Sequence, residues 1–382
     1  MPRLPAPHSP RLPRAAHQPR AAHSIASGPP PISAPVSVQP LPEHAAVPVP
    51  VAATGPVPAS SDAVPARGSR HSIADTELLV HPLALGCSVF GWTVDGAGSL
   101  RILDRHRALG GNFLDTADSY SAGRSEVLIG TWLRSRRARE STVIATKIGR
   151  NPDHPGLSPR NITAAVHASL QRLGTDYIDL LYFHLDDPYV PLEESLGAVD
   201  TLIRRGQVRY LAASNYSAER LMEARVLSAN GLPRFVALET HYNLVHREPF
   251  ESSLALVTHA QGMAVLPYFA LAHGFLAGRY RTKMEATGTA RAGRAAGYLN
   301  RRSLRVLSVI DRIAGEHGVQ PSTIALAWLL ARDGAMVPVA GAGHPDHVDA
   351  LVAAAGIRLG RADMMELDRV SVAATPATRS RR

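Results

Sequence analysis

The sequence predicts an α/β protein, a (β/α)8 or TIM barrel that follows a Pro-rich disordered N-terminal tail. The first observation behind this prediction is an alternation of short apolar runs with helix-like segments over about 300 of the 382 residues. The second is that eight such runs suit a closed barrel better than an open doubly wound sheet. The third is that 17 of the 30 prolines stand before residue 70, where the composition cannot form a packed core.

Each predicted strand is a short run rich in β-branched, aromatic and aliphatic residues. In chain order the runs cover residues 83–86, 112–117, 142–147, 178–184, 208–214, 235–241, 264–269 and 336–341. The helix-like segments between the first six runs include 99–110, 161–174, 191–206 and 217–231, and each of these ends in Gly, a common helix stop. Residues 71–80, before the first strand, are predicted to be a small hairpin that closes the bottom of the barrel.

Three parts of the chain differ in composition and charge. Residues 1–70 form a Pro-, Ala- and Arg-rich tail that is predicted to be disordered, residues 71–375 the predicted barrel, and residues 376–382 a basic C-terminal tail. Of the net charge of +9, residues 1–70 carry +4 and the last four residues carry +3, which leaves about +2 for the rest. A nearly neutral barrel without a basic, aromatic-rich stripe argues against nucleic-acid binding.

Several classes of protein are excluded by missing sequence features. The single cysteine, Cys87, rules out an internal disulfide and favours a reducing, cytoplasmic location. No run approaches the ~18 apolar residues of a membrane-spanning helix, so no membrane partner is expected. The chain lacks the Gly-rich loop of a Rossmann domain and the phosphate loop of P-loop proteins. It also lacks HExxH, GxSxG and Cys/His clusters, so no metal site or serine-hydrolase chemistry is predicted.

Polar side chains follow the predicted strands at the end where barrel enzymes carry their sites. They are Asp115, Lys147, His184, Ser214, Asn215, Glu239 and Tyr268, with Tyr120 in the loop after the second strand. Because the carboxyl ends of all the strands meet at one face of a barrel, these side chains are expected to surround one cavity.

Lys147 is a rare residue type in this chain, because only two of the 41 basic residues are lysines. A lysine that ends an apolar strand in so arginine-rich a chain indicates a need for a compact ammonium. Such an ammonium needs a carboxylate partner, which Asp115 supplies, and it lowers the pKa of a nearby tyrosine from ~10. Tyr120 is then expected to protonate a carbonyl oxygen that His184 orients. The chain offers neither a good nucleophile nor a metal site, so the electrons are expected to come from a cofactor.

Each of these residues also has a purely structural interpretation. Asp115 or Thr116 can cap the helix expected at residues 125–137, Tyr120 can be a packing residue, and His184 can be a hydrogen-bonded core histidine. The shared position of all four candidates after their strands favours the catalytic interpretation.

Seven segments of the chain, taken in order, resemble those of aldo-keto reductases over residues 71 to about 360. They are NFLDTADSYSAGRSEVLIGTWL, VIATKIG, LGTDYIDLLYFH, GQVRYLAASNYS, HYNLVHREPFE, LPYFALAHGFLAGRYR and ALAWLLA. The resemblance implies a catalytic tetrad of Asp115, Tyr120, Lys147 and His184. It also implies an NAD(P)H-dependent carbonyl reductase that transfers a hydride to an aldehyde, ketone or keto-sugar, with Tyr120 as general acid.

The resemblance further implies which residues hold the cofactor. Ser214 and Asn215 would hold the nicotinamide carboxamide, and Tyr268 would stack on the nicotinamide ring. The loop FALAHGFLAG, with Phe269 and Leu271, would cover the pyrophosphate.

Two departures from the family pattern concern the cofactor. The family usually has a glutamine after strand six, whereas this chain has Glu239, which donates a hydrogen bond only when protonated. Many relatives read GARxxxQLEEN after strand eight, where the arginine and glutamine contact the 2′-phosphate and the adenine. This chain reads GAGHPDHVDAL, with Gly343 and His347 at those positions, and it loses a charge-assisted phosphate contact. The expected cofactor is NADPH with a weaker preference than in the family, and NADH or dual use is the alternative.

The expected partner is a small carbonyl compound, bound between His184 and Trp92 of the segment VFGW. No feature of the sequence indicates an oligomeric state. The departures at the cofactor positions leave a second function open, a catalytically weak cofactor-binding barrel with a regulatory or partner-binding role.

Overall fold

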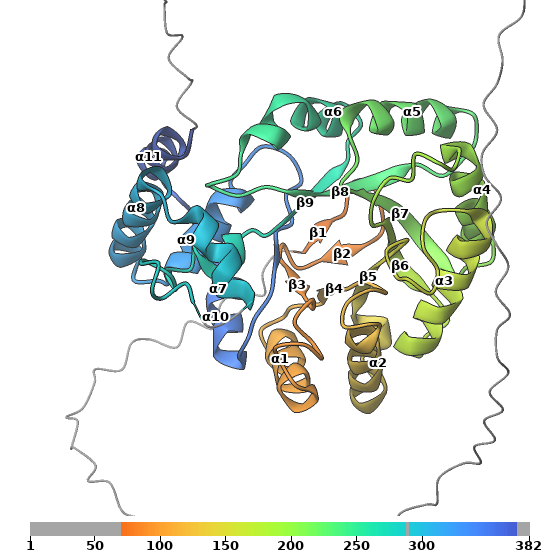
Figure 1. The fold of residues 1–382 in the computed structure, drawn as a ribbon, viewed down its shortest axis with the longest axis horizontal. Coiled ribbons are helices and arrows are strands. Elements are labelled where there is room, and N and C mark those ends of the chain that lie inside the picture. Colours follow the sequence, from red (N-terminus) through yellow and green to blue (C-terminus); the bar gives the residue numbers. More distant parts are fainter. Residues whose placement is uncertain (1–69, 288–289, 373–382) are drawn as a thin grey trace, which may run out of the picture. The chain divides into compact units, whose positions relative to one another are not determined.

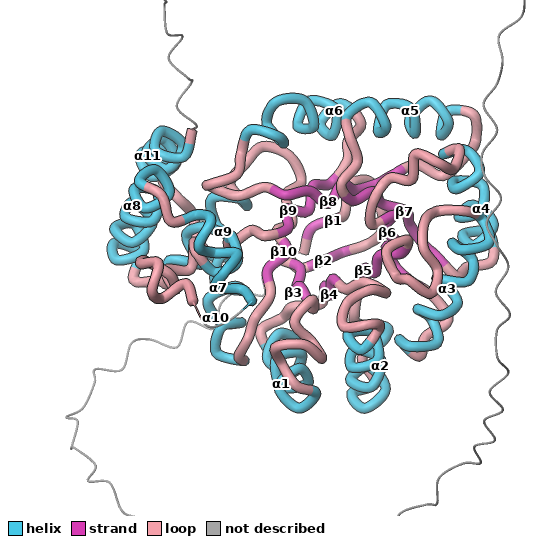
Figure 2. Tube along the Cα trace, viewed as in Figure 1, coloured by secondary structure: helices cyan, strands magenta, loops and turns pink. Residues whose placement is uncertain are grey.

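The computed structural model describes residues 70–287 and 290–372, where a short hairpin is followed by a barrel of eight parallel strands (Figure 1). Helices form a ring outside the strands (Figure 2). The strands lie in the order β10-β3-β4-β5-β6-β7-β8-β9, as eight successive parallel neighbours. The predicted (β/α)8 fold is therefore confirmed. The predicted tails at 1–70 and 376–382 lie, apart from Arg70, outside the described residues.

The elements follow the predicted alternation of strands and helices. The strands are β1 (His71–Ser72), β2 (Leu79–Val80), β3 (Ala84–Gly86), β4 (Phe113–Asp115), β5 (Val143–Ile148), β6 (Ile178–Phe183), β7 (Val208–Ser214), β8 (Phe235–His241), β9 (Ala264–Tyr268) and β10 (Val339–Ala340). The helices are α1 (Gly96–Ala108), α2 (Arg124–Arg136), α3 (Pro159–Leu173), α4 (Leu192–Arg204), α5 (Ala218–Ala229), α6 (Ala255–Ala260), α7 (Ala290–Ala295), α8 (Arg301–His317), α9 (Pro321–Leu330), α10 (Pro345–Ala353) and α11 (Arg361–Ser371). Among the residues described, no helix combines the length and the hydropathy needed to cross a lipid bilayer.

The last strand is shorter than the sequence predicts. Residues 336–341 are predicted as one strand, but only β10 pairs with β3. Pro338 has no N–H to donate to a ladder, although its carbonyl accepts from Ala84 N at 3.0 Å. Met336 instead forms an isolated parallel bridge with Val265 on β9. The two short pairings together close the barrel.

The hairpin β1–β2 covers the amino-terminal end of the barrel, as predicted. Its two strands pair in antiparallel register. The buried side chains of Ile73, Leu78 and Val80 belong to the same apolar cluster as the inward-facing Phe113 and Leu180. Figure 2 shows the hairpin inside the ring of barrel strands. An apolar plug at this end leaves the carboxyl ends of the strands as the place for a site.

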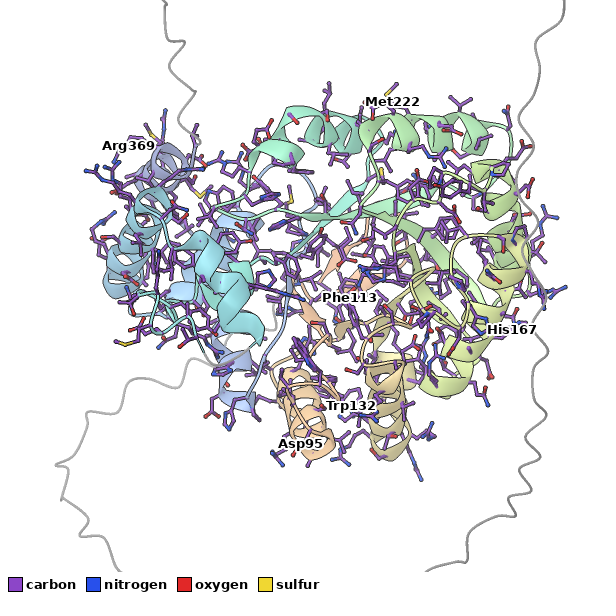
Figure 3. The ribbon with its side chains drawn as sticks, viewed as in Figure 1. Asp95, Phe113, Trp132, His167, Met222 and Arg369 are labelled. Carbon is purple, nitrogen blue, oxygen red and sulfur yellow. The ribbon has the colours of Figure 1, made fainter. Side chains whose placement is uncertain are left out.

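Alternate residues of the barrel strands face the interior and the surrounding helices. Leu114, Leu181 and Leu211 belong to the larger apolar core, which also contains the buried residues of the helices. Figure 3 shows Phe113 within the barrel and Met222 on the exposed side of α5. Because both faces of each strand are buried, the strands read as continuous apolar runs in the sequence.

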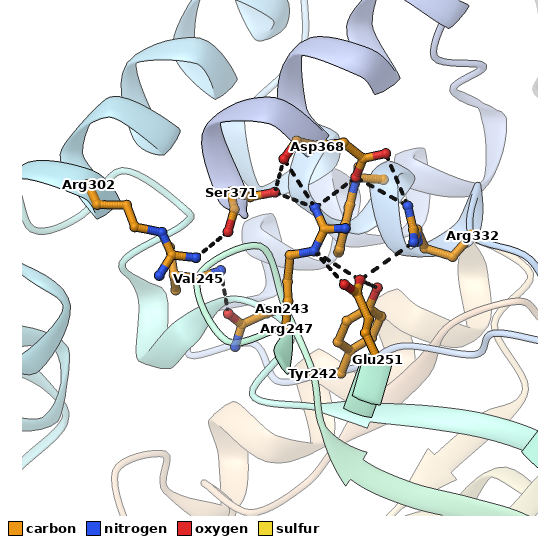
Figure 4. Close-up of polar contacts among 10 residues, drawn as sticks. Tyr242, Asn243, Val245, Arg247, Glu251, Arg302, Arg332, Asp368 and Ser371 are labelled. Carbon is orange, nitrogen blue, oxygen red and sulfur yellow. Dashed lines mark hydrogen bonds and ion pairs between the residues drawn. The ribbon is translucent and has the colours of Figure 1, made fainter. Parts of the chain in front are cut away.

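A group of ion pairs joins α11 to the segment that follows β8 (Figure 4). It consists of Arg247, Glu251, Arg332 and Asp368, and we call it the outer ion cluster. Arg247 Nε lies 2.9 Å from Glu251 Oε1, and Arg247 Nη1 lies 2.8 Å from Asp368 Oδ1. Arg332 lies 3.2 Å from Asp368 and 3.5 Å from Glu251, so each charged group has two partners of opposite sign. Both guanidinium groups also lie over the Trp328 ring, 5.1 and 5.2 Å from its centroid.

Candidate active site

A cavity of about 850 Å³ opens at the carboxyl ends of the barrel strands. Its size is in the range of small-molecule and cofactor sites. The predicted site residues that line it are Trp92, Asp115, Tyr120, His184, Ser214, Asn215, Glu239, Tyr268, Phe269, Leu271, Gly343 and His347. Lys147 does not line the cavity, because its side chain is only 1% exposed and lies beneath the surface that Asp115 and Tyr120 form. The structure thus brings the predicted residues together around one space.

Lys147 lies between two buried carboxylates, and we call Asp115, Lys147 and Glu239 the inner ion cluster. Lys147, near the end of β5, donates from Nζ to Asp115 Oδ1 at 2.6 Å and to Asp115 Oδ2 at 2.7 Å. The same Nζ donates to the Thr116 carbonyl at 3.2 Å. Glu239 Oε2, on β8, lies 3.1 Å from Nζ. The side chains are 1–3% exposed, so these charges act on one another in a low dielectric.

The protonation of the inner ion cluster follows from its burial and from its excess of carboxylates. Burial raises the pKa of Asp115, against the opposing effect of Lys147. Burial, followed by the charge of Asp115, raises the pKa of Glu239 to about 8. Burial acts to lower the pKa of Lys147, but Asp115 and Glu239 outweigh it and raise that pKa well above its ordinary value. Lys147 is therefore charged, and the carboxylates share a proton near neutral pH.

Tyr120 lies in the loop after β4, with its ring over Lys147. The ring centroid is 5.4 Å from Lys147 Nζ and 6.1 Å from the His184 ring, which it meets edge to face. The sequence predicts that Lys147 lowers the pKa of Tyr120, and Lys147 does act in that direction. Burial outweighs it, with Asp115 and Glu239 adding to the effect, and the pKa of Tyr120 is raised. The hydroxyl is therefore held in its protonated form, which suits an acid.

His184 follows β6 and faces the same space. Its backbone N–H donates to the Ile148 carbonyl at 3.0 Å, and its own carbonyl accepts from Asn215 Nδ2 at 3.1 Å. Burial, followed by the charges of Lys147 and Arg150, lowers the pKa of His184 to about 2. The imidazole is therefore neutral, and it can donate one hydrogen bond to a carbonyl oxygen without itself acting as the acid.

The helix-cap interpretation of Asp115 does not hold in the structure. α2 begins at Arg124, after Gly123 in a left-handed conformation with φ of 84°, and no side chain caps it. Asp115 bonds to Lys147 instead. Thr116 does contact the start of this helix, because its hydroxyl lies 2.8 Å from Ser125 Oγ.

Ser214 at the end of β7, Asn215 after it and Tyr268 at the end of β9 line one part of the cavity together. The Tyr268 hydroxyl donates to Asn215 Oδ1 at 2.6 Å, and Asn215 Nδ2 donates to Ser214 Oγ at 3.0 Å. The Tyr268 ring is stacked on His241 at 5.5 Å, and His241 is stacked on His246 at 3.7 Å. The stack supports the Tyr268 ring. This part of the cavity therefore offers an aromatic ring beside the Asn215 amide and the Ser214 hydroxyl.

The far end of the cavity contains a contact that the sequence did not reveal. Arg279 Nη2 lies 2.8 Å from His347 Nε2, and the cavity lining also includes Arg294, Asp346 and Gly343. Burial and the Arg279 charge lower the pKa of His347. The Arg279 guanidinium thus lies beside His347 at the end where Gly343 stands in place of an arginine. The signal that points to Arg279 is its position directly after the loop FALAHGFLAG.

Three partly exposed apolar side chains line the cavity and form what we call its apolar rim. Trp92, Leu185 and Phe269 are 52%, 42% and 41% exposed, and all three line the cavity. Leu185 is absent from the predicted site residues, although its place directly after the strand-four histidine is a usable signal. This apolar rim suits a substrate with an apolar or aromatic body.

Cys87 lies directly after β3, under the inner ion cluster. It is fully buried, and its N–H donates to the Asp115 carbonyl at 2.8 Å. Burial, followed by the charge of Asp115, raises the pKa of the thiol well above its usual range. The thiol is therefore neutral and unreactive in the folded barrel.

Comparison with known proteins extends these observations. A family model described as the aldo/keto reductase family matches residues 82–372. A norsolorinic acid reductase from Aspergillus flavus is 30% identical over 307 residues, which are 76% of this chain and 77% of that protein. An aryl-alcohol dehydrogenase from Pestalotiopsis microspora is 30% identical over 308 residues, 76% of this chain and 78% of that protein. An aldo-keto reductase from Alternaria alternata is 30% identical over 337 residues, 79% of this chain and 91% of that protein.

Proposed function

Because the chain belongs to the aldo/keto reductase family and is an NAD(P)H oxidoreductase, we propose that Tyr120 is the acid of a carbonyl reduction at the cavity bottom. The observation that carries this proposal is the placement of Tyr120 over Lys147, with the neutral His184 ring beside it. No other part of the described chain combines a buried ammonium, a protonated phenol and a hydrogen-bonding imidazole in one cavity.

The cavity lining fits a nicotinamide dinucleotide. When bound, that cofactor supplies the hydride. Ser214 and Asn215 offer hydroxyl and amide groups for its carboxamide, and the Tyr268 ring offers a face for its planar ring. Arg279 and Arg294, which also line the cavity, offer cations for its phosphates.

His184, Tyr120 and Lys147 have separate roles in the rest of the reduction. His184 donates a hydrogen bond that holds the carbonyl oxygen of the substrate beside Tyr120. As the carbon gains its new C–H bond and the C=O π bond breaks, the proton of the Tyr120 hydroxyl moves to the developing alkoxide. Lys147 stabilises the phenolate left on Tyr120, which then regains a proton from water.

The apolar rim favours an apolar or aromatic aldehyde or ketone over a keto-sugar. Trp92, Leu185 and Phe269 contribute partly exposed apolar surface to the cavity lining, and a polyhydroxylated substrate would leave its hydroxyl groups without partners against that surface. Two of the relatives carry names that refer to norsolorinic acid and to aryl alcohols, both aromatic compounds. These names support the same substrate class for this chain.

A direct test is oxidation of NADPH and NADH with a panel of aryl aldehydes, aliphatic ketones and keto-sugars. We expect Tyr120→Phe to lower turnover by about 10²–10⁴-fold, the usual contribution of a general acid. Cofactor affinity, followed by protein fluorescence, should change little. Equal rates in the two proteins would contradict the role of Tyr120. Tight cofactor binding without turnover of any carbonyl would instead support the alternative, a regulatory barrel.

For the cofactor we propose dual use of NADPH and NADH. Gly343, which follows β10, replaces the arginine expected there, but Arg279 supplies a cation at the same end of the cavity. Calorimetric titration should therefore give NADPH an affinity less than ~100-fold above that of NADH. Arg279→Ala should weaken NADPH binding more than NADH binding. A preference of ~100-fold or more for NADPH would contradict dual use.

A further inference from the structure

The inner ion cluster contains one more carboxylate than it has cations. Lys147 Nζ lies 2.6 Å from Asp115 Oδ1, and Glu239 Oε2 lies 3.1 Å from the same nitrogen. In the strand order, β8 is three places from β5, so Glu239 reaches Lys147 across the barrel interior. Among the described residues, Lys147 is the one cation within 4.0 Å of either carboxylate. Glu239 is thus a second counter-ion for an ammonium that Asp115 already pairs.

The surroundings of Glu239 do not neutralise this excess. The titratable groups around the cluster are the phenols of Tyr120, Tyr182 and Tyr268, the neutral thiol of Cys87 and the neutral imidazole of His184. Glu239 raises the pKa of each phenol, although burial is the largest cause in all three. Within the described residues, neither Glu239 Oε2 nor the Tyr182 hydroxyl has a hydrogen-bond partner. Among the residues that the structure describes, the Lys147 ammonium is therefore the only group that balances the charge of Glu239.

The excess carboxylate opposes the ionisation of Tyr120. The charges of Asp115 and Glu239 both act to raise the pKa of Tyr120, because like charges in a low dielectric repel one another. Because the pKa of Glu239 is about 8, Glu239 loses its proton before Tyr120 does. A Tyr120 phenolate would then be the third anion around a single ammonium.

We propose that Glu239 is a positioning residue that acts through Lys147 to keep Tyr120 in its protonated form. The inference rests on the proposed function in one respect, namely that Tyr120 is the proton donor. Carbonyl reduction starts from the phenol, whereas alcohol oxidation starts from the phenolate. Glu239 therefore confines alcohol oxidation by this site to a higher pH range, while reduction proceeds over the whole neutral range.

The test is an ultraviolet difference titration of tyrosine in the full-length, cofactor-free protein. The chain has 10 tyrosines, so the Tyr120 step is isolated by subtracting the titration of Tyr120→Phe in the same background. We expect Glu239→Gln to move the onset of the Tyr120 step to lower pH by about one unit. An unmoved onset in Glu239→Gln overturns the inference.

Two further variants separate charge from structure. Glu239→Asp keeps the carboxylate and should titrate like the wild type. Glu126→Gln removes another fully buried carboxylate, which lies 2.6 Å from Arg172 and accepts a hydrogen bond from Thr146 on β5, but makes no ion pair with Lys147. It should leave the Tyr120 step unmoved. A shift in Glu126→Gln equal to that in Glu239→Gln would show that loss of packing, rather than loss of the Glu239 charge, moves the step, and would overturn the inference.

A second readout uses the cofactor-loaded protein. The pH profile of alcohol oxidation should shift to lower pH by about one unit in Glu239→Gln and should stay in place in Glu126→Gln. The two proposals fail in different ways. A shifted titration in a protein that turns over no carbonyl leaves Glu239 in its role and removes the proposed function. Normal turnover with an unshifted titration supports the proposed function and removes the role of Glu239.

Discussion

The inner and outer ion clusters are built from the same kinds of groups but differ in charge balance and burial. The outer ion cluster has two guanidinium groups and two carboxylates, with side chains 8–34% exposed. The inner ion cluster has one ammonium and two carboxylates, with side chains 1–3% exposed. The cluster with equal numbers of cations and carboxylates lies at the edge of the barrel, and the cluster with one carboxylate in excess lies at the floor of the cavity.

This difference separates a structural role from a chemical one. A balanced, partly hydrated network keeps its members charged at modest cost and holds segments together. An unbalanced buried cluster is costly to form and shifts pKa values strongly, which is typical of functional sites. The inner ion cluster should therefore govern proton transfer, and the outer ion cluster should govern the stability of the C-terminal region.

The largest effect is expected from Lys147→Met, which leaves two buried carboxylates without a cation. The free energy of unfolding should fall by about 3–5 kcal/mol at pH 8, and carbonyl reduction should be lost with it. Urea unfolding and NADPH oxidation measure the two effects. Lys283→Met is the matched control, since it changes the only other lysine, which is exposed, and should alter neither quantity. Near-normal stability of Lys147→Met would contradict the charge imbalance described for the inner ion cluster.

Arg247→Met should weaken the outer ion cluster without leaving its two carboxylates unpaired. It removes the guanidinium that bridges Glu251 and Asp368, and Arg332 remains as their partner. The expected cost is about 2–3 kcal/mol in the free energy of unfolding, with turnover within about twofold of wild type. Urea unfolding and steady-state rates test this separation. A loss of turnover without a loss of stability would mean that the two clusters do not have separate roles.

The dependence of stability on pH should distinguish Glu239 from an ordinary carboxylate. Its folded-state pKa of about 8 lies above the unfolded value of ~4.3, so its contribution to stability is present below pH ~4.3 and lost as the pH rises to 8. Between these values the unfolded state binds fewer protons, and stability falls by up to about 1.4 kcal/mol per pH unit. Glu239→Gln should remove this slope in urea unfolding between pH 5 and 8. Parallel curves for the two proteins would argue against the raised pKa.

The smallest expected effect is the response of the outer ion cluster to salt. Arg332 is 26% exposed and makes the longer contacts, so Arg332→Met should cost about 1 kcal/mol at low ionic strength. At 1 M salt the Debye length is about 3 Å, and this cost should fall by a few tenths of a kcal/mol. The pH profile of turnover, which depends on the inner ion cluster, should not change with salt. A salt-shifted pH profile would show that the inner charges are exposed to solvent.

The sequence was sufficient for the barrel and for gathering the candidate residues in one cavity. Both follow from one geometric fact, that parallel strands of a closed barrel end at the same face. Asp115, Lys147 and His184 could be placed together because each follows its own apolar run. The shortened β10 is a local exception that Pro338 explains.

Two properties of the site depended on contacts that no local pattern encodes. The sequence suggested that Lys147 lowers the pKa of Tyr120, but depth of burial decides the net direction, and depth is a property of the packed barrel. Glu239 was expected at the carboxamide position, yet its ion pair with Lys147 depends on the width of the barrel interior. Arg279 and His347 lie 68 residues apart, and only the fold brings them into contact.

Because of its position, Cys87 can serve as an intrinsic probe of barrel opening. As the single thiol of the chain, fully buried and bonded through its backbone to Asp115, it should react with a thiol reagent only when the cavity end of the barrel opens. The labelling rate of the unmodified protein therefore measures how often β3 and β4 separate from the cavity floor. No engineered cysteine is needed, and protection by a bound nucleotide would appear directly as slower labelling.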